Sequence, residues 1–122
     1  MNTIGKSTRK VNKSNLPKNV DISYHTIELR LLDSLTSNEV GEQQGSYLAK
    51  EQIIFLDDQI IAEGGSRAIS LVLHELGHAI YYIYNLKDRE EEPTVDSFAN
   101  GYTEVFKRNK DLTKWMLRNL DG

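Results

Sequence analysis

Apolar and polar residues alternate in two stretches near the start of the chain. Val20, Ile22 and Tyr24 are the apolar positions of the first stretch, and after a shift of phase at His25 the alternation resumes over residues 27–31. A period of two is typical of half-buried strands. Two further short strands, joined by a tight turn, are predicted at residues 45–47 and 53–56. Residues 34–45 carry no such pattern and are expected to form a loop.

The second half of the chain has the spacing of helices. Three are predicted, over residues 67–84, 93–106 and 111–120, with a charged connection at 87–92. The first is apolar around most of its circumference and is therefore expected to be buried. Ser66 and Asp111 are candidate N-caps, and Asn85 is a candidate end of the first helix. Strands followed by helices indicate an α+β fold.

Length and composition fit one globular domain. The 122 residues are 39% hydrophobic and 27% charged, without the roughly 18-residue apolar stretch that spans a membrane. We therefore expect a cytoplasmic protein with no membrane partner. The chain contains no cysteine, which excludes disulfides, thiolate metal ligands and a cysteine nucleophile. Any metal ion must be held by His, Asp or Glu.

Charge is unevenly distributed along the chain. Residues 1–18 contain five of the 15 basic residues and no acid, so the remainder holds ten bases against 18 acids, a net charge of −8. We expect residues 1–18 to form a flexible basic tail ahead of a single domain at 19–122. The tail offers one route to nucleic acid, but the acidic body argues against broad nucleic-acid binding.

The first predicted helix contains the sequence His-Glu-Leu-Gly-His at residues 74–78. His74 and His78 are four residues apart and share a helix face, so both imidazoles can bind one ion. Glu75 is placed to act on a water molecule without binding the ion itself. Two His ligands, an open position and an adjacent base suit hydrolysis by Zn²⁺. Gly77, unfavourable within a helix, is expected to let another backbone, such as a strand, approach.

A catalytic zinc ion takes three protein ligands. Glu92 and Asp96 lie four apart on the next predicted helix and share a face. We predict Glu92 as the third ligand, with Glu91 as its main competitor, and Asp96 as the acceptor that orients a ligating imidazole. An acidic helix N-terminus, favoured by the helix dipole, is the alternative explanation of these carboxylates.

Together these segments resemble a known family. Residues 74–78 match the HExxH motif of zincin metallopeptidases, and residues 92–99 are similar to the second helix of the gluzincin branch. The nearest group is the ImmA/IrrE-like compact peptidases of bacteria and phages, which have a Gly-x-Tyr segment and a strand before HELGH. The resemblance covers residues 45–106. It departs from the family pattern where Val95-Asp96 replaces Ala-Asn and where Pro93 follows Glu92.

The resemblance implies a zincin-like fold, a small mixed sheet packed on the active-site helix with one or two further helices. It also implies that an edge strand lines the substrate cleft, and residues 53–56 are the candidate for that strand. An extended peptide or protein substrate would bind there by strand addition. The family's cytoplasmic setting, in a bacterium or a phage-infected host, is expected to apply.

The sequence therefore predicts a zinc metalloendopeptidase in which Glu75 is the general base. Candidates for the donor that stabilises the oxyanion are Tyr102, Tyr81, Tyr82 and His25, among which the sequence does not choose. One alternative is a zincin-shaped binding or regulatory protein without turnover, although the presence of Glu75 argues against it. Another is an accessory nucleic-acid binder acting through the basic tail.

Overall fold

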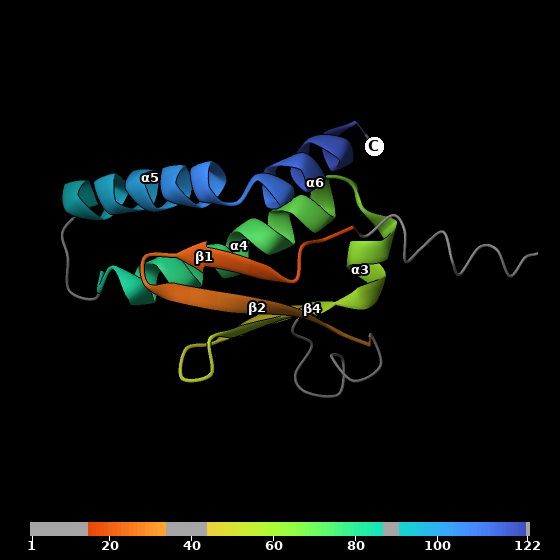
Figure 1. Cartoon of the computed structure of the whole chain (residues 1–122), viewed down its shortest axis with the longest axis horizontal. Coiled ribbons are helices and arrows are strands. Elements are labelled where there is room, and N and C mark those ends of the chain that lie inside the picture. Colours follow the sequence, from red (N-terminus) through yellow and green to blue (C-terminus); the bar gives the residue numbers. More distant parts are fainter. Residues whose placement is uncertain (1–14, 34–43, 87–90, 122) are drawn as a thin grey trace, which may run out of the picture.

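Strands precede helices along the chain, as the sequence predicts. The computed structural model describes residues 15–33, 44–86 and 91–121, and within them four strands and four helices (Figure 1). The strands are β1 (Asn19–Ile22), β2 (His25–Leu32), β3 (Gly45–Leu48) and β4 (Ile53–Asp57). The helices are α3 (Asp58–Glu63), α4 (Gly65–Ile83), α5 (Glu91–Arg108) and α6 (Lys110–Leu120). The α+β class is confirmed, and three helices accompany α4 rather than one or two.

Some predictions fall outside the described residues. These are the tail at residues 1–14, the loop at 34–43 and the connection at 87–90. At the described end of the tail, Leu16 packs against the core, and the carbonyl of Lys18 accepts a hydrogen bond from the Leu29 N–H at 2.7 Å. Over the described residues, no helix combines the length and apolar character needed to cross a bilayer.

The sheet is mixed, with strand order β1-β2-β4-β3. The pairs β1–β2 and β3–β4 are antiparallel, while β2 and β4 are parallel. The prediction that residues 53–56 form the edge strand is wrong, because β4 pairs on both sides and β3 is the edge strand. An unbroken apolar run such as residues 53–56 suits an interior strand.

The shift of phase at His25 marks a hairpin turn. Ser23 has a positive φ of 56°, and Tyr24 is fully exposed in the turn between β1 and β2. The strand expected to include Tyr24 therefore ends at Ile22. The alternation continues two residues past the strand, because the polar Ser23 and the aromatic Tyr24 of the turn also fit the pattern.

Helix α3 has no counterpart in the sequence-based prediction. The Asp57 side chain caps it by accepting hydrogen bonds from the backbone N–H groups of Gln59 and Ile60, at 2.9 and 3.1 Å. A short polar side chain before a helix commonly plays this part. Asp57-Asp58 thus ends β4 and begins α3.

The capping residues of α4 and α6 also differ from those predicted. Gly64, rather than Ser66, is the N-cap of α4 and supplies no side-chain bond. The N–H of Gly65 instead donates to the Asn119 side-chain oxygen of α6, at 2.9 Å. Asn109, rather than Asp111, is the N-cap of α6. At the other end of α4, Asn85 takes a left-handed φ of 53°, which confirms it as the residue that ends the helix.

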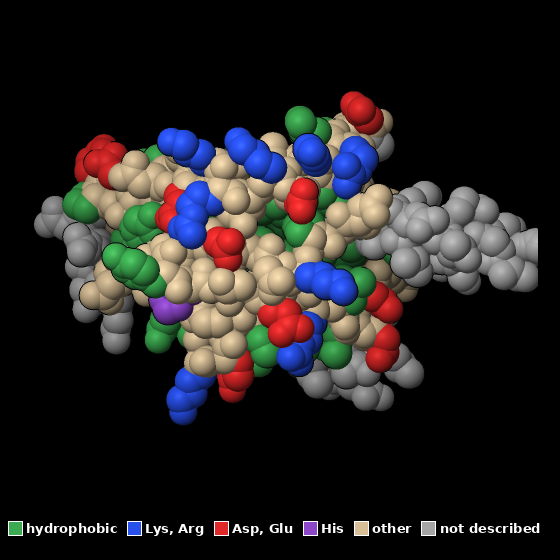
Figure 2. All heavy atoms as spheres, viewed as in Figure 1, with side chains coloured by type: hydrophobic (Ala, Val, Ile, Leu, Met, Phe, Trp, Pro, Cys, Tyr) green, Lys and Arg blue, Asp and Glu red, His purple; other side chains and the backbone are tan. Residues whose placement is uncertain are grey.

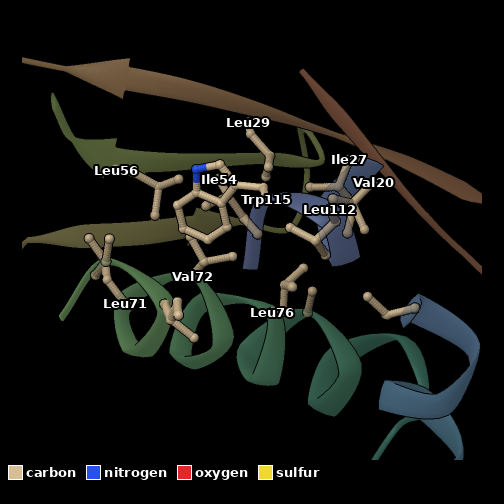
Figure 3. Packing of buried hydrophobic residues seen from close by; sticks show 14 of the residues in the cluster. Val20, Ile27, Leu29, Ile54, Leu56, Leu71, Val72, Leu76, Leu112 and Trp115 are labelled. Carbon is tan, nitrogen blue, oxygen red and sulfur yellow. The ribbon is translucent and has the colours of Figure 1, made fainter. Parts of the chain in front are cut away.

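The core lies between the sheet and α4 (Figure 3). Val72 and Leu76 of α4 face Ile54 of the sheet, and all three are at most 1% exposed. Trp115 of α6, fully buried, packs into the same layer. Burial of a large aromatic side chain contributes about 2–3 kcal/mol relative to exposure, so α6 is a structural part of the domain.

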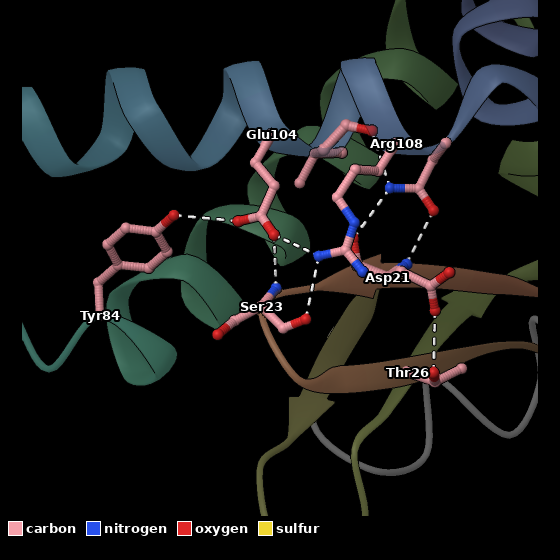
Figure 4. A network of polar contacts seen from close by, with 8 residues as sticks. Asp21, Ser23, Thr26, Tyr84, Glu104 and Arg108 are labelled. Carbon is pink, nitrogen blue, oxygen red and sulfur yellow. Dashed lines mark hydrogen bonds and ion pairs between the residues drawn. The ribbon is translucent and has the colours of Figure 1, made fainter.

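A polar network fastens α5 to the β1–β2 turn and the end of α4 (Figure 4). The Glu104 carboxylate accepts hydrogen bonds from the Ser23 N–H at 2.7 Å and the Tyr84 hydroxyl at 3.0 Å, and it pairs with Arg108. Arg108 also donates to the carbonyl of Ser23, at 3.0 Å. These contacts join residues from three elements, so they fix the register of α5.

Asn109 covers the outer edge of β1. Its side-chain amide donates to the Asp21 carbonyl at 3.0 Å and accepts from the Asp21 N–H at 2.8 Å. The side chain therefore takes both backbone bonds that another strand would make at this position. Pairing of β1 with a further strand is blocked there, whereas β3 at the opposite edge has no such cover among the described residues.

Candidate active site

The two histidines of the motif lie on an exposed stripe of α4. His74 and His78 are exposed, in line with Ser70 one turn earlier and Arg67 two turns earlier, whereas Glu75 is 4% exposed. The expectation that α4 is buried around most of its circumference is therefore wrong on this face. The predicted sharing of a face by His74 and His78 is confirmed, because residues four apart on a helix project in the same direction.

The two imidazoles are placed as ligands of one ion would be. Their Nε2 atoms are 3.2 Å apart, and the ring centroids are 4.8 Å apart at an interplanar angle of 81°. Two nitrogens bound tetrahedrally to Zn²⁺ at about 2.0–2.1 Å are separated by about 3.3 Å. The pair thus fits two adjacent positions around one zinc ion. A hydrogen bond between two neutral rings has the same separation.

Glu75 is a buried carboxylate with an unused oxygen. Among the described residues, its Oε1 has no hydrogen-bond partner. Burial raises the pKa of Glu75 above its ordinary value, and His78 and His74 act in the opposite direction. Leaving such a group unpaired costs about 1–3 kcal/mol or more. The side chain of Glu75 lines the same cleft as the two histidines, so this buried oxygen is an unsatisfied acceptor beside them.

A cleft of about 820 Å³ separates β3 from α4 and contains these three side chains. Gly45, Ser46 and Tyr47 line it on the strand side. On the helix side the lining runs from Arg67 at one end, past His74, to Tyr82 at the other. An edge strand and the helix that carries the two histidines therefore form opposite walls of the cleft, although the edge strand is β3 rather than residues 53–56.

No carboxylate completes a set of three ligands in the part of the chain that the structure describes. There, no group of three or more His, Cys, Asp or Glu side chains could hold a metal ion. The register of α5 on α4 explains why Glu92 does not lie beside the two histidines. Gly101 packs against Ile80, and Glu92 lies nine residues, roughly 14 Å, nearer the start of α5. Since α5 runs back along α4, Glu92 lies toward and beyond the end of α4.

The other acidic candidates have similar positions. Glu91, Glu92 and Asp96 are exposed on the first turns of α5. Asp96 is five residues, about 7.5 Å along the helix, before Gly101. The structure thus assembles His74 and His78 beside Glu75 without adding any of the three acids to them. The roles assigned to Glu92, Glu91 and Asp96 stay predictions.

The four candidate oxyanion donors fall in different places. The hydroxyl of Tyr102 donates to the Leu73 carbonyl at 2.6 Å, so its proton is engaged. His25 and Tyr81 line a separate hollow of about 490 Å³ at the end of α4. Tyr82 lies in the cleft itself, besides lining that hollow. Of the four, Tyr82 alone lines the cleft that holds the histidines.

Gly77 provides room for Tyr102. A Cβ atom at Gly77 would lie 3.0 Å from the Tyr102 hydroxyl oxygen, which is tighter than most real contacts. The expectation that a backbone approaches Gly77 is wrong, because the neighbour is a side chain of α5. Tyr102 thereby links α5 to the turn of α4 that carries His74 and His78. Because the Tyr102 side chain is partly buried, the pKa of its hydroxyl lies above the ordinary value.

Sequence reasoning missed Tyr47, Ser70 and Arg67 as residues of the cleft. Tyr47 contacts Tyr82 edge to face at 6.2 Å, and Gln52 donates to its hydroxyl at 2.9 Å. Its position two residues after Gly45 put it on the same side of β3, which was a usable signal. Arg67 and Ser70 stand seven and four residues before His74, so helical spacing also placed them on its face.

Comparison with known proteins yields no relative: the chain matches no protein-family model, no curated protein and no solved structure. The described architecture is a small α+β fold with a four-stranded mixed sheet. Any function must therefore be argued from the residues of this chain.

Proposed function

We propose that the protein is a zinc-dependent metallopeptidase. One observation carries the proposal: His74 and His78 place their Nε2 atoms 3.2 Å apart next to the buried, unpartnered Oε1 of Glu75. Two imidazoles and an adjacent carboxylate on consecutive turns form the HExxH arrangement. The resemblance of residues 45–106 to compact bacterial and phage peptidases supports the same reading.

The residues present suit zinc. Imidazole nitrogens are favoured ligands, and the separation of the pair matches tetrahedral geometry. Zinc, when bound, supplies a Lewis acid that brings the pKa of a water molecule to about 7. Glu92 as the proposed third ligand, with Glu91 as the alternative, would require the first turns of α5 to move toward the histidines, because both residues lie toward and beyond the end of α4. Asp96 is proposed to accept a hydrogen bond from a ligating imidazole.

Glu75 is the proposed general base. Its Oε1 accepts the proton of the attacking water, and the carboxyl group then delivers that proton to the amine that leaves. Burial suits this role, because a raised pKa makes the Glu75 carboxylate a stronger base toward the attacking water. Tyr82 is the proposed donor to the oxyanion among the four predicted candidates, since it lines the cleft.

The proposed substrate is an extended peptide laid along β3. The strand has an unpaired edge among the described elements and forms one wall of the cleft. Backbone hydrogen bonds to such an edge hold a peptide largely independently of its sequence. Addition of a strand would place the peptide between β3 and α4, within reach of Glu75.

The test combines metal content with turnover. Protein purified without a metal-affinity tag is expected to hold about one zinc ion per chain. His78→Ala should lose that zinc, whereas Glu75→Gln should keep it and lose cleavage of an unstructured protein substrate such as casein. Arg118→Gln, an exposed change on α6, is the matched control and should retain both properties.

Each result has a definite meaning. Zinc binding without any cleavage would leave a metal-binding protein and reject the peptidase. Failure of the wild type to bind zinc near neutral pH would mean that the 3.2 Å contact is only a hydrogen bond between the rings. Loss of zinc in Glu92→Ala but not in Glu91→Ala would identify Glu92 as the third ligand.

A further inference from the structure

Arg67 is an unpaired cation within the cleft. It is the third residue of α4, is exposed, and lines the end of the cleft opposite Tyr82. Among the described residues it makes no ion pair and no hydrogen bond through its side chain. Among the described residues that line the cleft, Glu75 is the one acidic side chain, and it is buried two turns away.

Helix stability does not account for a cation at this position. The first turn of a helix favours anions, and the first turn of α4 contains no acidic residue to balance Arg67. Asn119, which binds the Gly65 N–H, is neutral. Both the guanidinium and the helix dipole therefore attract negative charge to this end of the cleft.

Other exposed cations gather elsewhere. Figure 2 shows Lys and Arg side chains along the edge formed by α5 and α6, where the exposed residues are Lys107, Lys110, Lys114 and Arg118. None of these four lines the cleft. A nucleic-acid strand would require several cations along its path. The described lining of the cleft offers one cation, which suits a single carboxylate.

We propose that Arg67 binds a carboxylate of the peptide and makes the enzyme selective for acidic substrates. The guanidinium fits a carboxylate through two parallel N–H···O bonds. Ser70, one turn further along α4 and also in the cleft lining, supplies a neutral hydroxyl beside it. The inference rests on the proposed peptidase function and names the substrate class of the same site.

Geometry sets the place of that carboxylate. Arg67 precedes His74 by seven residues, which is two turns on one face and about 10.5 Å along the helix. An extended peptide covers this distance in about three residues. The recognised group is therefore an Asp or Glu side chain, or the C-terminal carboxylate, about three residues from the bond that is cleaved.

The test uses a set of short, otherwise uncharged peptides with amidated C-termini. One Glu is moved along the peptide, and each member has a Gln counterpart. We expect wild-type kcat/KM to be about tenfold higher for Glu than for Gln at the favoured position. A matching peptide without internal Glu, but ending there as a free acid, distinguishes the C-terminal carboxylate from a side chain.

Variants of Arg67 provide the control for charge. Arg67→Gln should abolish the preference, and Arg67→Lys should restore part of it. Arg67→Glu should transfer the preference to an added peptide that carries Lys in place of Glu at the favoured position. Arg118→Gln should leave it unchanged. Equal rates for the Glu and Gln peptides at every position would overturn the inference while leaving the peptidase itself established.

Binding gives a second readout that needs no turnover. In NMR titrations of Glu75→Gln, the Glu peptide should bind about tenfold more tightly than the Gln peptide, and Arg67→Gln added to that variant should remove the difference. If no peptide is cleaved by the wild type but this difference is found, the peptidase fails and the carboxylate site stands. Equal affinities would reject the site.

Discussion

A Cβ atom placed on Gly45 would stand 3.0 Å from Oε2 of Glu75 and 3.1 Å from its Cγ. The same atom would lie 3.0 Å from the carbonyl oxygen of Phe55 on the neighbouring strand. The edge strand therefore passes directly beside the carboxyl group of the proposed base, and it is held there by its pairing with β4. Glycine at this position leaves room for the Glu75 side chain, which a larger residue would crowd.

Gly45→Ala is expected to impair catalysis more than metal binding. The added methyl group must displace either the Glu75 side chain or β3, and misplacement of a general base by a fraction of an ångström lowers turnover about tenfold or more. Zinc content should stay near one per chain, because His74 and His78 project from α4. Steady-state cleavage and metal analysis measure the two effects.

Lys50→Ala, in the exposed turn after β3, is the control for Gly45→Ala. It should leave both turnover and zinc content unchanged. Loss of zinc together with activity in Gly45→Ala would indicate that the change disturbs the whole cleft rather than Glu75 alone. Unchanged turnover would contradict the importance of this contact.

Glu75→Gln is expected to stabilise the metal-free protein while abolishing turnover. Ionisation of Glu75 costs free energy in the folded state, because burial desolvates the carboxylate and Oε1 has no partner among the described residues. A neutral amide of the same shape reduces that cost, by about 1 kcal/mol or more in the free energy of unfolding. Urea denaturation of both proteins in the presence of a chelator measures the difference.

Glu51→Gln, an exposed substitution in the β3–β4 turn, serves as the control and should change stability by less than about 0.5 kcal/mol. A Glu75→Gln variant that is less stable than the wild type would mean that the carboxylate has a partner in solution. Stabilisation with loss of activity would mark Glu75 as a residue kept for function at the expense of stability.

Much of the fold follows from periodicity. Alternation located β1 and β2, and apolar spacing located α4, α5 and α6, because each element buries one side against a shared core. Helix α3 was missed because six residues are too short to show a helical period. Tyr24 was misplaced because an aromatic residue in a turn satisfies the alternation as well as one in a strand.

The part of the candidate site that lies on a single helix, α4, could be predicted from the sequence. The spacing of His74 and His78 fixes their common face, and the structure agrees. The place of Glu92 depends instead on how α5 packs on α4, which Gly101, Ile80 and distant hydrogen bonds decide. The capping of α4 by Asn119 depends in the same way on how α6 packs. Neither the place of Glu92 nor this cap can be predicted from a local sequence pattern.

Asn119→Ala is expected to destabilise the start of α4. Asn119 accepts from the Gly65 N–H at 2.9 Å and donates to the Trp115 carbonyl at 2.8 Å, in place of a local cap. Loss of a capping side chain costs about 0.5–2 kcal/mol. Asn119→Asp retains an acceptor oxygen and should recover part of the loss, whereas the exposed Asn100→Ala should have a small effect. Equal denaturation midpoints for the wild type and Asn119→Ala would contradict the cap.

Glu104 is expected to make the protein sensitive to acid. Burial alone would raise its pKa, but hydrogen bonds from the Ser23 N–H, Arg108 and Tyr84, together with the charge of Arg108, hold the pKa below the ordinary value of 4.5. The folded state therefore binds its proton more weakly than the unfolded chain. Its stabilising contribution is complete above about pH 4.5 and is lost as the pH falls through the lowered pKa of the folded state.

Comparison with Glu104→Gln isolates this contribution. At neutral pH the variant should be less stable than the wild type by roughly 1–2 kcal/mol, because a neutral amide binds the N–H and guanidinium groups more weakly. The difference should shrink as the pH falls below about 4.5, since the wild-type carboxylate is then protonated as well. Urea denaturation across that range measures it, with Glu51→Gln as an exposed control. A difference that stays constant with pH would show that the ionised form of Glu104 does not hold α5 to the β1–β2 turn.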